Sequence, residues 1–521
     1  MISMSNDYPS SALSMKFKLY FVVSFILILF ASIFIYVFIP PYAYAQIDSV
    51  RFLLNTIVSS LATIIAIVIS MSLVVIELTA SSYSTRVIDM FKQSPAIWIV
   101  ISTYILAIVY GMTVLKFLDV IAQSGLAIYE TTVWIAFFIS IVAFGALIPY
   151  ILSSLDIMKP STVINRFAER VTRENILTGI SESENIVARS ATSLSFSYLH
   201  PDILRPVTEI DKDPIQPIID MIHGSMMKYD YETTRYGLKV LENYLIDLLN
   251  TDDFDNDNIT ITKHIFIHLE RVGKLGASRD DEDSVLEVTS AIFMIGKKAV
   301  HEKIENITGE SINSLKNICR VVIKREHEDS IVNITDFIAD IGRDAVKYDL
   351  DFAATVSINS LGIIGRATTK LSPQDLEVTV GIAGTIEEIG ILSIKHSLNQ
   401  SVFHAVNSLG DVGKLAITNN LVNTTLMIVD YLYNMGVYTL KANMNHNTNR
   451  IAEYLWEIGR IAIWNEMNIL ALDKLINKVK DSLQKLMDLS QELGHNETAT
   501  IATLSLDKIE NLIQKTELND N

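Results

Sequence analysis

The chain has 521 residues, of which half are hydrophobic and 19% are charged, and its net charge is −17. Soluble domains normally have about a quarter of their residues charged, so the excess of apolar residues indicates membrane-spanning segments. The negative net charge disfavours nucleic acid as a partner, because binding a phosphate backbone requires a basic face. The single cysteine, Cys319, excludes an internal disulfide and any cysteine-cluster metal site.

Four apolar segments in the first third of the chain are each about as long as the roughly 20 residues that a helix needs to cross a bilayer. They are residues 17–39, 52–76, 96–115 and 127–152. The sequence therefore predicts an N-terminal tail over residues 1–16 and a four-helix transmembrane domain over residues 17–155. The lipid bilayer is the first expected partner.

The first apolar segment has two interpretations. Lys16, Lys18, the apolar run and the Ala-Tyr-Ala triplet at residues 43–45 resemble a secretory signal that is cleaved after Ala45. The apolar core of such signals is about 7 to 15 residues long, whereas this run has 23 residues. The length favours an uncleaved span, and the later topology is the same in either case.

Lysine and arginine residues near the span ends predict the orientation, since cytoplasmic loops carry an excess of them. Arg51 and Lys116 fall on one side. Eight fall on the other: Lys16, Lys18, Arg86, Lys92, Lys159, Arg166, Arg170 and Arg173. We therefore expect a multi-pass protein of the cell membrane with both termini in the cytoplasm.

The second apolar segment ends in the phrase VVIELTASSYSTRVIDMF, which resembles a motif of the form LxLASSQFSPRVL. This motif is typical of a prokaryotic family of predicted membrane proteins known as domain of unknown function 2254. The matching residues are Leu78, Ala80, Ser81, Ser82, Tyr83, Ser84, Arg86 and Val87. The chain departs from the pattern at Glu77 and Thr85 and gains a charge. The resemblance covers the transmembrane region only and implies membrane topology, because the family has no established activity.

Glu77 lies at the end of this apolar run and has two interpretations. Ionisable residues within spans are functional candidates because burying them is costly. The 25 apolar residues before Glu77 cover about 38 Å at 1.5 Å per residue, more than a roughly 30 Å hydrocarbon core. This length favours an interfacial anchor. A carboxylate at a pore mouth is the alternative, and Ser81, Ser82 and Arg86 are further candidates for the same site, although Arg86 lies half a turn round from Glu77 on a continuous helix.

A repeated phrase follows in the second half, as in FIADIGRDA, SLGDVGKLA and YLWEIGRIA. Its glycines recur mostly every 23 residues, with one interval of 46 and one of 25, and a cysteine occupies the position skipped in the longer interval. These nine register positions are Gly273, Gly296, Cys319, Gly342, Gly365, Gly390, Gly413, Gly436 and Gly459. Such periodicity is typical of repeat architectures.

Each repeat is expected to contain one helix of about 17 residues and about six connecting residues, since apolar residues recur at helical spacing and turn formers follow each glycine. Two units approach the 40 to 47 residues of HEAT and armadillo repeats. The fold class expected is therefore all-α, with a cytosolic α-solenoid-like array over residues 263–465. Glycine in a helix costs about 1 kcal/mol, so we attribute its recurrence to close helix packing.

The flanking regions are less regular. Residues 156–262 are expected to form a helical connecting region, and residues 466–521 amphipathic helices that cap the array or form a partner helix. The acidic run at residues 252–257 lacks the ligand spacing of an EF-hand. His264 and His268 share a helical face but lack the metalloprotease glutamate and a third ligand. We expect no metal, no cofactor and no catalytic residue, and therefore no enzyme.

Two functional hypotheses remain from the sequence. The first is a membrane-anchored protein-interaction or sensory scaffold, whose array binds a cytosolic protein or peptide. The second is a channel or transporter formed by a homo-oligomer, with Glu77 near its cytoplasmic mouth. The repeats support the first, and one carboxylate with nearby serines supports the second.

Overall fold

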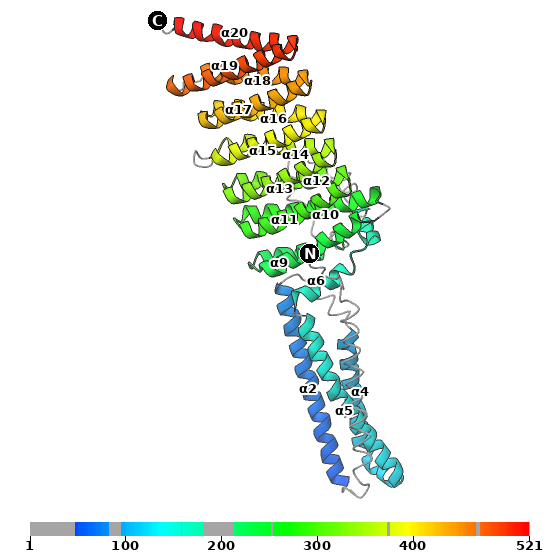
Figure 1. Cartoon of the computed structure of the whole chain (residues 1–521). Helices are drawn as coiled ribbons and strands as arrows, with labels where there is room; N and C mark the ends of the chain where they lie inside the picture. The colour runs from blue at the N-terminus through cyan, green and yellow to red at the C-terminus, as the bar shows by residue number, and fades with distance from the viewer. Residues whose placement is uncertain are drawn as a thin grey trace, which may run out of the picture. The chain divides into compact units, whose positions relative to one another are not determined.

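The computed structural model describes residues 47–82, 95–157, 159–181, 213–251, 254–371, 376–464 and 469–519. All regular secondary structure in these ranges is helical, as Figure 1 shows. The all-α class expected from the sequence is therefore confirmed for the described residues. The chain divides into two compact units, one containing residues 1–175 and 200–233 and the other residues 176–199 and 234–521.

Three long helices dominate the first unit: α2 (Ile47–Ser82), α4 (Pro95–Gln123) and α5 (Leu126–Ile157). Each contains one stretch that is long and apolar enough to cross a membrane, namely Ile47–Val74, Ile97–Gln123 and Ile128–Leu152. The described residues thus contain three candidate spans rather than the four expected. The expected first span, residues 17–39, and the alternative cleavage site after Ala45 lie outside the described residues.

The surfaces of these three helices explain why they are suited to lipid. Small or well-fitted side chains pack between them, and Gly111 of α4 lies so close to α2 that an added Cβ would be 2.6 Å from Val58 Cγ2. Close approach at small residues is typical of membrane helices. Large apolar side chains point outward instead, including Phe52, Leu73, Trp98, Leu106, Val120 and Ile148. Two short helices, α6 (Pro160–Ala168) and α8 (Gln216–Met226), also belong to this unit and contact each other.

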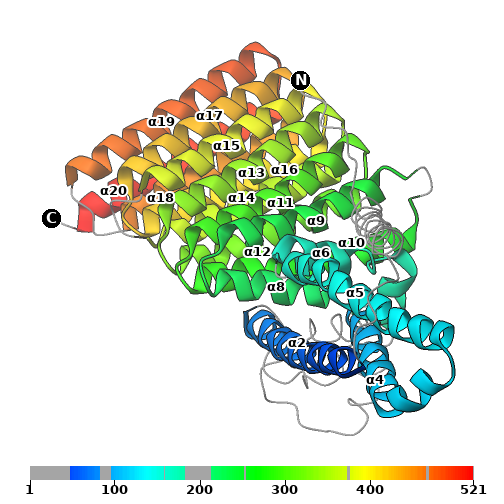
Figure 2. The same ribbon diagram turned by 90° about the horizontal axis from the view of Figure 1, so that it is seen from below.

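The second unit is a stack of helices in two layers, which Figures 1 and 2 show side by side. We call them the even layer and the odd layer after the helix numbers. The even layer comprises α10 (Asn256–Ser278), α12 (Glu305–Ile323), α14 (Asp351–Thr368), α16 (Asn399–Thr418), α18 (Asn445–Trp464) and α20 (Asn496–Asn519). The odd layer comprises α11 (Glu282–His301), α13 (Glu328–Lys347), α15 (Leu376–Lys395), α17 (Val422–Lys441) and α19 (Ile469–Glu492). Helix α9 (Tyr231–Leu249) precedes them.

Each helix contacts the next helix in the chain and the next but one, which lies in the same layer. The buried side chains at helical spacing form one continuous core between the layers, as with Ile334, Ile338 and Ile341 in α13. Helices α19 and α20 continue the stack, because α19 contacts α17 and α20 contacts α18. Their buried residues Leu475 and Val479 extend the same core.

The connections are tighter than the six residues expected. Helices α11 to α14 and α16 to α18 have 18 to 20 residues, and three or four residues join most neighbours. One residue per turn is in the left-handed conformation, seven residues after a register position: Asp280, Lys303, Glu326, Asp349, Ser397, Asn420 and Asn443. In six of these seven turns the amide of the following residue bonds back five residues, as in Ile304 N to Ala299 O at 2.9 Å. This Schellman geometry closes a helix quickly, so more residues stay helical.

Candidate functional site

Glu77 is exposed on α2, three residues beyond Val74, where the candidate span ends. Helix α2 continues without interruption to Ser82, so Ser81 and Ser82 belong to its last turn. Arg86 lies outside the described residues. A carboxylate just beyond the apolar stretch of a continuous helix agrees with both interpretations, the interfacial anchor and the pore mouth.

The charged groups at the other end of α2 are paired. The guanidinium of Arg51 lies 2.7 Å from Asp119 of α4 and 3.4 Å from Asp48 of its own helix. Arg51 and Glu77 are 26 residues apart, which is about 39 Å along a helix. Between them, α2 carries no ionisable side chain. The charges of α2 therefore mark the two ends of an apolar stretch as long as a membrane is thick.

The register positions lie where each helix meets two others. A Cβ added to Gly413 would be 2.8 Å from Ile458 Cδ1 in α18 and 3.0 Å from Ile428 Cγ2 in α17. A Cβ added to Gly390 would be 2.9 Å from the Cβ of Ala405 in α16. Real Cβ atoms are essentially never so close, so glycine is what allows these helices to approach. Cys319 takes the same position in α12 and is fully buried.

The outer surfaces of the two layers differ in charge. The even-layer helices α10, α12, α14, α16 and α18 carry nine Lys or Arg residues and eight Asp or Glu residues. The odd-layer helices α11, α13, α15 and α17 carry six and twelve. Five of the odd-layer acids and three of the even-layer acids lie in first turns, and the remaining seven and five lie further along the helices.

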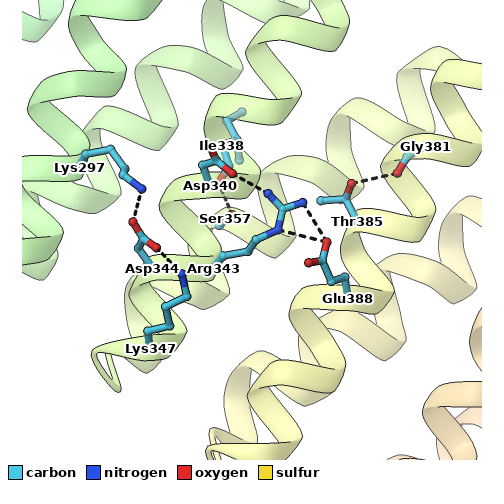
Figure 3. A network of polar contacts seen from close by, with 10 residues as sticks. All are labelled: Lys297, Ile338, Asp340, Arg343, Asp344, Lys347, Ser357, Gly381, Thr385 and Glu388. Atoms are coloured by element: carbon cyan, nitrogen blue, oxygen red, sulfur yellow. Dashed lines mark hydrogen bonds and ion pairs between the residues drawn. The ribbon is translucent and has the colours of Figure 1, made fainter.

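Ion pairs join successive helices of the odd layer, as Figure 3 shows. Asp344 of α13 binds Lys297 of α11 and lies 3.0 Å from Lys347. Arg343 of α13 lies 2.6 Å from Asp340 and 2.8 Å from Glu388 of α15. These pairs connect α11, α13 and α15 along the outer face.

Not all acids of this face are stabilised as anions. The pKa of Asp344 is lowered, because burial opposes the charge but hydrogen bonds from Lys297 and Lys347 outweigh it. The pKa of Glu387 is raised, mainly by burial and also by the nearby charge of Asp430, against a hydrogen bond from Asn434. The acidic face thus contains carboxyl groups whose pKa values are shifted in opposite directions.

The even layer repeats a different set of groups. The residue directly after each register position is basic in all five helices: Lys274, Arg320, Arg366, Lys414 and Arg460. Six residues before the register position, α12, α14 and α16 have an asparagine, namely Asn313, Asn359 and Asn407. We call these sets the basic row and the amide row. Sequence reasoning missed both, although aligning the repeats at twice their period would have revealed them.

The remaining sequence candidates lie on α10 and directly before it. His264 and His268 of α10 lie with their Nε2 atoms 3.3 Å apart, and His268 is buried. In the acidic run before α10, the carboxylate of Asp255 accepts a hydrogen bond from the amide of Asn258 at 3.0 Å. Asp255 therefore acts as the N-cap of this helix.

The fold and these surfaces define an integral membrane protein that continues into a helical-repeat unit. Residues 15–216 match the family described as "Predicted membrane protein (DUF2254)". The resemblance expected over the transmembrane region is therefore confirmed.

No curated protein matches the chain. Six solved chains do, among them one described as "Circular tandem repeat protein with novel repeat topology and enhanced subunit contact surfaces". It is 11% identical with a TM-score of 0.36, and the match covers 71% of this chain and 86% of that one. Similarity of this degree does not establish a shared fold.

Proposed function

We propose that this protein is a non-enzymatic scaffold of the cell membrane, whose array binds a protein or peptide partner. The stack is in our interpretation an α-solenoid of the HEAT or armadillo kind, an architecture that creates extended binding surfaces. The observation that carries the proposal is the division of labour within each repeat. Glycine and apolar residues build the stack, whereas the side chains of the basic and amide rows are exposed or half-buried.

The orientation belongs to the same proposal. Lysine and arginine residues are concentrated at one end of the predicted spans, and this end includes Lys159 and Arg166 where the chain leaves the last span toward the array. They support an orientation with both termini and the array in the cytoplasm. A partner bound there would be held next to the membrane.

Site-specific crosslinking in cells tests the scaffold function. A photoreactive amino acid is introduced at Asn359 in the even layer, at Asn333 in the odd layer, or at Trp98 on the membrane helices as a control. We expect one protein partner to be captured in stoichiometric amount from an array position and not from Trp98. If neither array position captures a protein from correctly inserted full-length chain, the scaffold proposal is wrong.

The exposed carboxylate of Glu77 on α2 supports a second candidate, an oligomeric channel or transporter. Ion flux through the purified protein in liposomes tests it, with Glu77→Gln compared with wild type over a range of pH. Glu130→Gln, at the start of α5, is the matched control. Flux that responds to Glu77→Gln alone would support a pore, and absence of flux in folded, inserted protein would remove this candidate.

A further inference from the structure

The basic row has one side chain on each of the even-layer helices α10, α12, α14, α16 and α18. Its five members, defined above, occupy one register position on helices that contact each other in turn. Packed helices lie about 8 to 10 Å apart, so the row presents positive charge at that interval. In the odd layer the same position is basic only in the first two helices, at Lys297 and Arg343. It is apolar in the next two, at Ile391 and Val437. The continuous row is thus a property of one face only.

Neutralisation of the row is uneven. Near the C-terminal end of the array, Lys414 lies 3.2 Å from Asp411 and 3.0 Å from Glu457. Arg366 lies 3.6 Å from the same Asp411. These groups alternate in sign across α14, α16 and α18. The charge of Lys414 is therefore compensated by two carboxylates, whereas Arg366 has only a longer contact with a carboxylate that it shares with Lys414.

Arg320 of α12, the second member of the row, is not compensated in this way. Arg320 is exposed and forms no ion pair with any of the described residues. Lys316, one turn before it, has a lowered pKa because of burial and then because of the charge of Arg320, in spite of Glu270 and Glu310. Glu270 is already engaged by Lys274 at 2.5 Å and by Asn317 at 3.0 Å. The positive charge of Arg320 therefore remains without a partner on α12, among the described residues.

The amide row runs beside the basic row. Each asparagine is half-buried in the outer face, so its amide is held in place but remains accessible. Asn313 accepts a hydrogen bond from Lys316 at 2.6 Å, and Asn407 accepts one from Tyr454 at 3.1 Å. Asn359 has no hydrogen-bond partner in the described part of the chain. A side-chain amide offers both a donor and an acceptor, which is what a peptide backbone requires.

We propose that the even layer binds an extended acidic segment of a partner protein. The amide row bonds the backbone of the segment, and Arg320 and Arg366 pair with its carboxylates. This inference rests on the scaffold function proposed above and assigns the face and the chemistry of the partner. The acidic odd layer repels such a segment, so binding is confined to one side of the array.

The spacing of the rows matches an extended chain. Polyproline II conformation advances about 3.1 Å per residue and repeats every three residues, which gives about 9 Å per repeat. This distance equals the separation of packed helices, about 8 to 10 Å. Over α12, α14 and α16 one backbone unit in three can therefore meet an asparagine, and about fifteen residues would span the five helices of the basic row at roughly three per helix.

Peptide selection on the full-length protein tests the proposal. The protein is placed in lipid nanodiscs, and random peptides of about fifteen residues, roughly three per even-layer helix, are selected after counter-selection on empty nanodiscs. The dissociation constants of the recovered peptides are then measured by fluorescence anisotropy at low and high salt. We expect the recovered peptides to be enriched in Asp and Glu, and their binding to weaken with salt because screening reduces charge attraction.

Matched variants separate the roles of the two rows. The double variant Arg320→Gln/Arg366→Gln should weaken binding at least about tenfold and reduce its salt dependence. Asn359→Ala should weaken the binding of the same peptides without changing the salt dependence of that binding. Lys395→Gln/Lys441→Gln removes the same charge from exposed sites of the odd layer and should leave the dissociation constant within about twofold. Equal thermal unfolding of all variants shows that the array remains folded.

Three results would overturn the proposal: recovery of peptides that are not acidic, binding that ignores the arginine pair, or no recovered peptide at all. None of these would by itself remove the scaffold function, because crosslinking from the odd layer reports on that function independently. A partner captured from Asn333 but not from Asn359 would keep the scaffold and reject the even layer as its binding face.

Discussion

The even and odd layers of the array have the same repeat and almost the same core, yet their outer faces are opposite in character. In both layers a glycine or Cys319 occupies the register position, and apolar residues pack around it. Outside the core, the even layer continues its basic row through five helices. The odd layer replaces this row by ion pairs, apolar residues and uncompensated acids.

The positions of the repeat that differ between the layers are the ones that can vary without disturbing the stack. A position that both layers share is fixed by the stacking of helices, since a change there alters contacts with two neighbours. A position that differs systematically between the layers has no such constraint. Function is therefore best sought where alternate repeats diverge, and stability where all repeats agree.

The largest expected effect concerns the shared positions, and α15 allows a matched test. A Cβ added to Gly390 would be 2.9 Å from Ala405 Cβ and 2.8 Å from Met435 Cε, whereas a Cβ added to Gly381 meets nothing within 4 Å. Overpacking costs about 1 to 3 kcal/mol, whereas alanine for glycine in an exposed helix gains up to about 1 kcal/mol. We expect Gly390→Ala to destabilise the array and Gly381→Ala to stabilise it.

Hydrogen exchange of the full-length protein measures both effects, because local opening free energies follow from amide protection. Faster exchange in α15 and α17 is expected for Gly390→Ala, and slower exchange in α15 for Gly381→Ala. Equal responses of the two variants would show that helix propensity alone explains the glycines and would reject the packing explanation.

The helices of the array were largely predictable from the sequence, because glycine recurs inside them at a fixed interval and few other structures require glycine in this way. The glycine register indicated the helices, and Glu326, seven residues after Cys319, has the left-handed conformation of the other turns. The cysteine unit is therefore a repeat like the rest. Connection length was not predictable, because left-handed lysine, glutamate and serine carry no sequence signal comparable to glycine.

The candidate sites were less predictable for a physical reason. Glu77 attracts attention because a charge near a span is rare, whereas a basic residue on a helix surface is common. Arg320 and Asn359 gain meaning only through their equivalents in neighbouring helices of one layer. Pairing of helices into layers makes the relevant period 46 rather than 23 residues, and the folded stack shows this pairing directly.

A smaller effect concerns the ion pairs that distinguish the odd layer. The pKa of Asp344 is lowered in the folded state, so its contribution to stability is present above its unfolded pKa of about 4 and is lost as pH falls through the folded value. Asp344→Asn should reduce the free energy of unfolding by about 1 kcal/mol near neutral pH. Urea unfolding followed by circular dichroism measures this loss, and the gap to wild type should close in acid. A gap independent of pH would mean that the loss is steric.

The smallest effect is expected at Glu387, where the sign is opposite. Burial raises the folded pKa of this carboxyl above its unfolded value, so the folded state binds more protons and stability falls as pH rises from the unfolded pKa through the folded one. Glu387→Gln removes this cost and can still accept the hydrogen bond from Asn434, which is 3.0 Å long in wild type. We expect a gain of less than about 1 kcal/mol at neutral pH that disappears in acid, measured by the same urea titration. A loss at neutral pH would instead show that the charge of Glu387 stabilises the odd layer. The difference between Asp344 and Glu387 would then have to come from their hydrogen bonds and not from the burial of Glu387.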